Sequence, residues 1–236
     1  MPTSQEQITE AIKSYYAQEL KSNQDLKTNA CCATESLPAY IREVLKSIHP
    51  EVTSRFYGCG SPIPNAIENK VVLDLGCGTG RDSFIFSKLV GENGHVIGID
   101  MTPAQIAIAI KYADYHRNKF GYRCSNTTFH EGYIEDLSTI NIEDNSIDLV
   151  TSNCVLNLCY DKQKAFKEIF RVLKPGGELY FSDVFCSRRI PENLQRDPIL
   201  RGECLGGALY IEDFRRLLAK LGCYDYRVDS NVRIQI

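Results

Sequence analysis

The sequence lacks the features that mark export, membrane insertion or nucleic-acid binding. Residues 1–10 are polar, and no basic segment leads into an apolar one, so nothing resembles a secretory signal. No uninterrupted apolar stretch approaches the ~18 residues that a membrane span needs. The net charge is only −3 and no long run of like charge is present, which gives a nucleic acid little to bind. We therefore expect a cytoplasmic protein with no membrane or nucleic-acid partner.

Ten cysteines among 236 residues are the unusual feature of the composition. In a reducing cytoplasm they should be free thiols, metal ligands or parts of a redox cycle. Structural disulfides would follow if the chain were exported, but a protein of this size buries roughly 70% of its unfolded surface and needs no cross-link. No pair has the C-x-x-C spacing of a zinc site, which weakens the zinc interpretation.

The N-terminal quarter of the chain has helical periodicity. Apolar residues recur at helical spacing over residues 4–20, and a second helix is predicted from about Pro38. The polar stretch between them carries the pair Cys31-Cys32. We interpret residues 1–55 as a helical segment that includes a flap over the substrate site, and residues 56–236 as the main domain.

From Lys70 onward, short apolar strands alternate with helices, which predicts a doubly wound, Rossmann-like α/β sheet covered on both faces. The expected strands are Val71–Leu75, His95–Asp100, 127–130, 147–152 and 178–184. A helix is also predicted over 211–221, and it ends at Gly222. The stretch 224–236 is predicted as the one further strand region.

A glycine-rich turn, Asp74-Leu75-Gly76-Cys77-Gly78-Thr79-Gly80, follows the first strand and leads into a helix. Its glycines allow a tight turn and a close approach of the backbone to a ligand. Asp100 ends the second strand, where a carboxylate can accept hydrogen bonds from ribose hydroxyls. The G-x-G-x-G spacing is shorter than the dinucleotide motif, so an NAD-dependent enzyme is the less favoured interpretation. Asp74 could also merely brace the turn.

With Leu173-Lys174-Pro175-Gly176-Gly177 before a strand, this pattern resembles the class I methyltransferases, which use S-adenosylmethionine. The resemblance implies that the turn holds the methionine part of the cofactor and that Asp100 holds the ribose. It places the segment after the third strand by the adenine, and Asn153 beside the methyl group. The implied cofactor-binding residues are Asp74, Gly76, Gly78, Gly80, Asp100, Met101, Ile134, Glu135 and Asn153. For Glu135, a solvent-facing position is the alternative.

Three cysteines flank the edge at which doubly wound sheets bind ligands, beyond the carboxyl ends of the strands. Cys154 follows the fourth strand, and Cys204 lies in the connection after the fifth. Cys59 precedes the first strand, in a loop that could fold over the same edge. Three thiols from distant segments could therefore converge near the transferable methyl group. Each of them alone could instead be a buried structural cysteine.

Five motifs resemble the arsenite methyltransferases, and the match covers nearly the whole chain. They are Asp25-Leu26-Lys27-Thr28-Asn29-Ala30-Cys31, Tyr57-Gly58-Cys59-Gly60-Ser61-Pro62, Gly80-Arg81-Asp82, Ser152-Asn153-Cys154-Val155-Leu156-Asn157-Leu158 and Gly202-Glu203-Cys204-Leu205-Gly206-Gly207-Ala208-Leu209-Tyr210. The resemblance implies that Cys59, Cys154 and Cys204 bind arsenic(III). It also implies that Cys31 exchanges disulfides with Cys59, which makes these four cysteines the candidate catalytic residues. The remaining six cysteines match no ligand of the family.

The same resemblance implies the partners of the reaction. The methyl donor would be S-adenosylmethionine, and the substrates would be arsenite and methylarsenite as thiol conjugates. Thioredoxin or glutathione would restore the protein thiols after each reduction. Thiolate is the preferred ligand of a soft centre such as trivalent arsenic. Arsenic loses no proton when its lone pair takes a methyl group, so no general base is required. None of the four histidines lies in a matched motif, which agrees with this.

Class I methyltransferases usually carry a final antiparallel strand beside the last parallel ones, and only one strand region is predicted after 178–184. We therefore expect a fragment or a truncated form that lacks part of the C-terminus. Two other functions remain open. One is a carbon- or oxygen-methylating enzyme of a small metabolite, with the cysteines in its core. The other is a non-catalytic thiol protein that binds arsenic or zinc.

Overall fold

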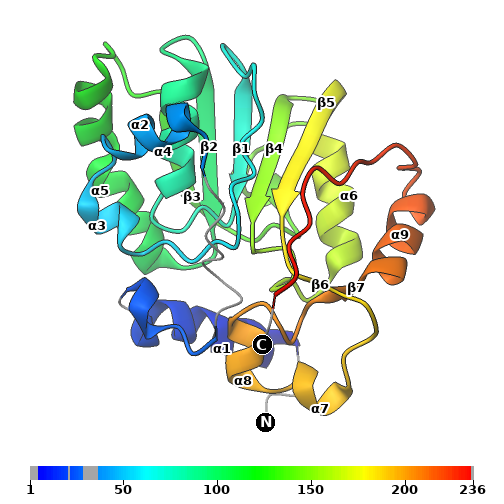
Figure 1. The fold of residues 1–236 in the computed structure, drawn as a ribbon. Coiled ribbons are helices and arrows are strands. Elements are labelled where there is room, and N and C mark those ends of the chain that lie inside the picture. Colours follow the sequence, from blue (N-terminus) through cyan, green and yellow to red (C-terminus); the bar gives the residue numbers. More distant parts are fainter. Residues whose placement is uncertain (1–4, 21, 29–36, 235–236) are drawn as a thin grey trace.

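The core of the molecule is a parallel sheet of five strands in the order β3-β2-β1-β4-β5 (Figure 1). The computed structural model describes residues 5–20, 22–28 and 37–234. The strands are β1 (Val71–Leu75), β2 (His95–Asp100), β3 (Thr127–Glu131), β4 (Ile147–Asn153) and β5 (Leu173–Ser182). The doubly wound prediction is therefore confirmed. Strand order reverses between β1 and β4, which is where such sheets bind their ligands.

Helices cover both faces of the sheet, as a parallel sheet requires. One face packs against α4 (Arg81–Val90) and α5 (Pro103–Phe120), together with the short helices α2 (Ala39–Leu45) and α3 (Pro50–Thr53). The other face packs against α6 (Lys162–Val172) and α9 (Ile211–Lys220). The predicted boundaries hold because their signals are local: the Asp161 side chain caps α6, and Gly121 ends α5 with a left-handed backbone.

A smaller layer lies beyond the carboxyl ends of the strands (Figure 1). It contains α1 (Gln5–Ser14), a π-helical turn (Tyr15–Glu19), a 3-10 turn (Asn23–Asp25) and α8 (Pro198–Gly202). The short elements β6 (Phe185–Cys186), α7 (Glu192–Gln195) and β7 (Leu209–Tyr210) lead into and out of it, and a further 3-10 turn (Leu137–Ile140) follows β3. The helix expected over 4–20 thus ends its α-helical part at Ser14. Sequence reading missed α8, although Asp197-Pro198 is a capping residue followed by proline at the first helical position.

Two strand predictions differ from the structure. The fifth strand begins at Leu173, not 178, because Leu173 already pairs with Ile147 before an irregularity in the β4–β5 register. The strand expected over 224–236 is wrong for its described part, 224–234, which has no regular pairing. Side chains hold that segment instead: the Tyr180 hydroxyl donates to Asp229 at 2.6 Å, and the Tyr226 ring packs on Phe214.

No helix among the described residues combines the length and the apolar character needed to cross a bilayer.

The α6 and α9 side of the sheet should depend on Phe166, which is fully buried and contacts the rings of Phe181 and Phe214. We expect Phe166→Ala to lower the free energy of unfolding by about 3–5 kcal/mol, because a large cavity replaces the ring. Urea denaturation measures this. Ile110→Ala, at an exposed position, is the control and should change stability by less than about 0.5 kcal/mol. Equal effects of the two changes would contradict this account of the core.

Candidate functional site

A cavity opens at the carboxyl ends of β1, β2 and β4, where the sequence predicted a ligand site. Its walls are the glycine-rich turn, the ends of β2 and β4, the 55–58 loop, residues 132–135 and the N-terminal helix. All the predicted cofactor-binding residues except Gly80 line it. Gly80, the last residue of the glycine-rich turn, directly precedes α4 and is not among the lining residues.

The glycine-rich turn is shaped by backbone hydrogen bonds and tight packing. The amides of Gly76 and Cys77 both donate to the carbonyl of Ile99, at 2.8 and 2.9 Å. Gly76 has a φ of 69°, and a β-carbon there would lie 2.3 Å from the Val155 side chain. Only glycine therefore lets β1 turn this sharply against the segment that follows β4.

Asp100 is tied to the turn as well as to its own strand. Its carboxylate accepts hydrogen bonds from the amides of Gly78, at 3.0 Å, and Thr102, at 2.8 Å. Burial raises its pKa. Asp74 accepts a hydrogen bond from the Ser83 hydroxyl at 2.5 Å, so it does brace the start of α4 while also lining the cavity. Burial, with the nearby charge of Asp82, raises the pKa of Asp74 to about 7.

The cavity holds more acids than bases. Asp74, Asp82, Asp100 and Glu135 line it, against Arg55 and Arg81. Arg81 already pairs with Asp82 at 2.9 Å and stacks over the ring of Phe56. Glu135 is half-buried at the cavity wall and does not face open solvent. Asp74 and Asp100, the two of these carboxyl groups whose pKa values are raised, favour a ligand that brings positive charge and hydroxyl donors.

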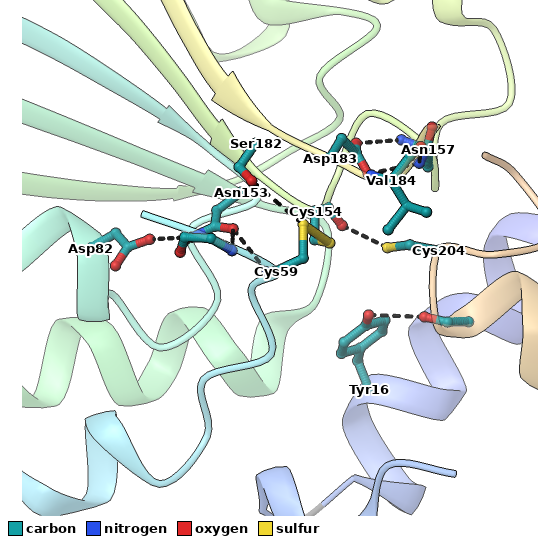
Figure 2. The surroundings of a disulfide bond; sticks show 12 residues. Tyr16, Cys59, Asp82, Asn153, Cys154, Asn157, Ser182, Asp183, Val184 and Cys204 are labelled. Carbon is teal, nitrogen blue, oxygen red and sulfur yellow. Dashed lines mark hydrogen bonds between the residues drawn. A yellow bond between two sulfur atoms is a disulfide. The ribbon is translucent and has the colours of Figure 1, made fainter. Parts of the chain in front are cut away.

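Asn153 joins the cavity to the loop that carries Cys59 (Figure 2). Its side-chain oxygen accepts hydrogen bonds from the amides of Cys59, at 3.0 Å, and Gly60, at 3.3 Å. Its side-chain nitrogen donates to the Gly60 carbonyl at 2.9 Å and to the Asp82 carboxylate at 2.8 Å. The amide is thus occupied in holding the loop against α4, a role that the sequence did not reveal.

The three predicted arsenic-binding cysteines meet at this edge of the sheet. Cys59 and Cys154 form a disulfide, with their Cα atoms 5.7 Å apart. The thiol of Cys204 donates to the carbonyl oxygen of Cys154 at 2.8 Å (Figure 2). Residues 95 and 50 positions apart in the chain are therefore brought together. Cys31, the fourth candidate, lies outside the described residues, so its exchange with Cys59 stays a prediction.

The backbone at two of these cysteines is strained. Cys154 has a φ of 62° and Cys204 a φ of 65°, in the left-handed region that residues with a β-carbon rarely adopt. Such conformations cost of order 1–3 kcal/mol and persist only where the surroundings enforce them. Both side chains are almost fully buried. Strain at two neighbouring thiols is an independent sign of a functional site.

Asp183 belongs to the same cluster and was missed by the sequence reading. One of its oxygens lies within 4.8 Å of the sulfurs of both Cys59 and Cys154. It accepts hydrogen bonds from the amides of Asn157, at 3.0 Å, and Val184, at 2.8 Å. Burial raises its pKa to about 7. Asp183 could have been predicted as a site residue from its position just after β5, because ligands bind at that edge of the sheet.

Three of the other described cysteines differ from the cluster of Cys59, Cys154 and Cys204. Cys77 and Cys159 line the cavity, but burial raises the pKa of each thiol well above its usual range. A protonated thiol is a poor nucleophile and a poor ligand. Cys124 is exposed and lies away from the cavity lining. Their interpretation as residues outside the ligand set stays a prediction.

A family model described as a methyltransferase domain matches residues 67–222. The chain belongs to this methyltransferase family, and its sheet order is that of the class I, Rossmann-like members. Two curated relatives are arsenite methyltransferases: one from Homo sapiens is 51% identical over 96% of this chain, and one from Aquipseudomonas alcaligenes is 47% identical over 96%. The chain spans 61% and 65% of their lengths.

A solved structure agrees with these relatives. An arsenic(III) S-adenosylmethionine methyltransferase from Chlamydomonas reinhardtii is 52% identical, with a TM-score of 0.76 over 79% of this chain and 62% of its own. Identity at this level, over a region that includes the cysteine motifs, does not favour the carbon- or oxygen-methylating alternative or an NAD-dependent enzyme.

The raised pKa of Asp74 leads to a testable dependence of stability on pH. In the unfolded chain Asp74 loses its proton near pH 3.8, whereas the folded chain keeps it to about pH 7. Between these values the folded state binds more protons, so stability falls as pH rises. Asp74→Asn removes this contribution, which is of order 4 kcal/mol. We expect urea midpoints to fall more steeply from pH 4 to 7 in the original chain than in the variant. Parallel pH profiles would contradict the assignment.

Proposed function

We propose that this chain transfers methyl groups from S-adenosylmethionine to trivalent arsenic held by Cys59, Cys154 and Cys204. One observation carries the proposal: three cysteines from distant segments lie together at the switch point of a methyltransferase sheet. Cys59 is bonded to Cys154, the Cys204 thiol donates to the Cys154 carbonyl, and Cys154 lines the cavity. Curated relatives named arsenite methyltransferases, at 47–51% identity, support the choice of substrate.

The residues that line the cavity fit S-adenosylmethionine. The cofactor carries two positive charges and ribose hydroxyls, and the cavity offers Asp74, Asp100 and Glu135. A buried oxygen of Gln105, which also lines the cavity, has no hydrogen-bond partner among the described residues. When bound, the cofactor supplies an electrophilic methyl group on a sulfonium, which the arsenic lone pair takes to leave S-adenosylhomocysteine. Asp100 would hold the ribose, and the 132–135 segment would lie by the adenine.

Capture of arsenic requires the disulfide to open first. Two thiols of a reductant become a disulfide, and Cys59 and Cys154 become free thiols. Arsenous acid then exchanges its three hydroxyl groups for three cysteine sulfurs, and each hydroxyl leaves as water with a thiol proton. Three sulfurs on one side leave the arsenic lone pair pointing away from them. The chain's contribution to rate is to hold this lone pair in line with the cavity, which can supply several kcal/mol.

Asn153 fixes that geometry in this proposal. By bonding to both the Cys59 loop and Asp82, it sets the distance between the sulfurs and the helix that starts after the glycine-rich turn. No residue has to remove a proton from the reacting atom. Methyl transfer raises arsenic to the pentavalent state, so two electrons must return it to the trivalent state. Protein thiols supply them, Cys31 included, and thioredoxin or glutathione restores those thiols in a reducing cytoplasm.

The thiolate site predicts a sharp difference between cysteines. Cys154→Ser and Cys204→Ser should each lower arsenite methylation by at least about 100-fold, because a serine hydroxyl is a much weaker ligand of soft arsenic than a thiolate and does not restore the near-attack geometry. Transfer of labelled methyl from the cofactor to arsenite measures this. Cys124→Ser, at an exposed position, is the matched control and should leave the rate unchanged. Full activity in both site variants would end the proposal.

The same assay separates the alternatives. A carbon- or oxygen-methylating enzyme would not use arsenite as a substrate at all. A sequestering thiol protein would bind arsenite, measured by calorimetry, without releasing a methylated product.

The relay role of Cys31 makes a distinct prediction. Cys31→Ser should leave the first methyl transfer in a single turnover intact, because Cys31 is not one of the three arsenic ligands. It should slow repeated turnover several-fold with thioredoxin as reductant, because the protein thiols can then no longer supply the two electrons that return arsenic to the trivalent state. The neighbouring change Cys32→Ser is the control. Unaltered turnover with every reductant would show that Cys31 has no such role.

A further inference from the structure

Glu203 is a fully buried carboxylate that sits directly before Cys204. It accepts hydrogen bonds from the Tyr15 hydroxyl at 2.7 Å, the Lys27 amide at 2.6 Å and the Thr28 amide at 2.7 Å. All three donors belong to the N-terminal segment, by which we mean the described residues 5–20 and 22–28. Hydrogen bonds to a carboxylate are stronger than those between neutral groups, especially where water is excluded. A single side chain therefore ties the N-terminal segment to the loop that carries Cys204.

The backbone packing at this junction is equally close. Gly202 lies against the Tyr15 ring, where a β-carbon would be 2.8 Å from the nearest ring atom. The Tyr16 hydroxyl donates to the Gly202 carbonyl at 2.9 Å (Figure 2). The Cys204 loop, residues 202–206, is thus held from the side of the N-terminal segment. This support explains how Cys204 keeps its left-handed backbone, since such strain persists only where neighbours enforce it.

The N-terminal segment also forms a wall of the cofactor cavity. Thr9, Ile12 and Tyr16 line it, from α1 and the π-helical turn that follows. The Tyr16 carbonyl accepts a hydrogen bond from the Gln105 side chain, which lines the same cavity, at 3.2 Å. π-helical turns are uncommon and occur often at functional sites. The segment therefore contacts both the cofactor cavity and the Cys204 loop, and Tyr16 takes part in both contacts.

We propose that Glu203 is a positioning residue that couples the cofactor cavity to the thiol site. Its carboxylate holds the N-terminal segment closed over the cavity and fixes the sulfur of Cys204 in the same arrangement. Loosening it should weaken cofactor binding, although Glu203 itself does not line the cavity. The role in arsenic chemistry rests on the proposed function, whereas the coupling to cofactor binding and to the N-terminal segment does not.

The test compares Glu203→Gln with Glu192→Gln, a matched change at an exposed glutamate of α7. The glutamine amide presents N–H groups to donors that the carboxylate accepted, so the contacts with Lys27 and Thr28 should open. We expect the affinity for S-adenosylhomocysteine, measured by calorimetry, to fall about 10-fold, within the usual range of coupling between sites. Amide hydrogen exchange at Lys27 and Thr28 should become faster. Glu192→Gln should change neither.

Two further variants keep the test decisive. Glu203→Asp retains both oxygens on a shorter side chain, and it should recover part of the lost affinity, which a merely space-filling role would not predict. If Glu203→Gln does not fold, Tyr15→Phe deletes one donor only and should give smaller changes in the same direction. In arsenite methylation, the variants should raise the KM for the cofactor more than they lower kcat.

A folded Glu203→Gln with unchanged cofactor affinity and unchanged exchange at residues 27–28 would overturn the coupling. A lower melting temperature with no other change would assign Glu203 a structural role alone. Failure of the original chain to methylate arsenite would contradict the proposed function, but it would leave the binding and exchange results, and hence the coupling, standing.

Discussion

The site depends on one side-chain amide, that of Asn153, which joins three segments that the sequence keeps far apart. It bonds to the Cys59 loop through two amides and a carbonyl, and to α4 through Asp82. Each such bond contributes about 0.5–1.5 kcal/mol net. The geometric effect matters more: together with the Cys59–Cys154 disulfide, these bonds fix the loop over the end of β4 and so set the position of the Cys59 sulfur relative to the cavity.

The parallel sheet explains why these groups meet at this place. Parallel strands deliver all their carboxyl ends to one edge, so Asp74, Asp100, Asn153 and Asp183 arrive there from four different strands. Buried carboxyl groups on one side favour a cationic ligand, and thiols on the other side favour a soft one. The same edge can therefore hold an electrophile and its nucleophile opposite one another, and the proposed transfer to an arsenic lone pair would need no proton-transfer residue between them.

Much of this could be predicted from the sequence because its signals are local. Strand boundaries at Val71–Leu75 and His95–Asp100, the cap at Asp161 and the glycine at 121 each depend on neighbouring residues alone. Topology indicated that Cys59, Cys154 and Cys204 could lie at one edge of the sheet, although each alone could also have been a buried structural cysteine. The clamp by Asn153, the contribution of Asp183 and the buried Glu203 could not be predicted, because each depends on which atoms face one another across distant segments. The strand expected over 224–236 is wrong over its described part, 224–234, for a related reason: the sequence of a segment does not show whether a partner strand lies beside it.

The disulfide and the Glu203 contacts together suggest how the site is prepared for its substrate. With Cys59 bonded to Cys154, two of the three proposed ligands are unavailable, yet Cys204 is already held beside them. Cys154 and Cys204 both have left-handed backbones, and such strain persists only where the surrounding structure enforces it. Reduction would then release two thiols into an arrangement that is already set by the hydrogen bonds of Asn153 and of the buried Glu203 carboxylate. Arsenic would have little to reorganise on binding, and pre-organisation of this kind is what favours both capture and in-line transfer.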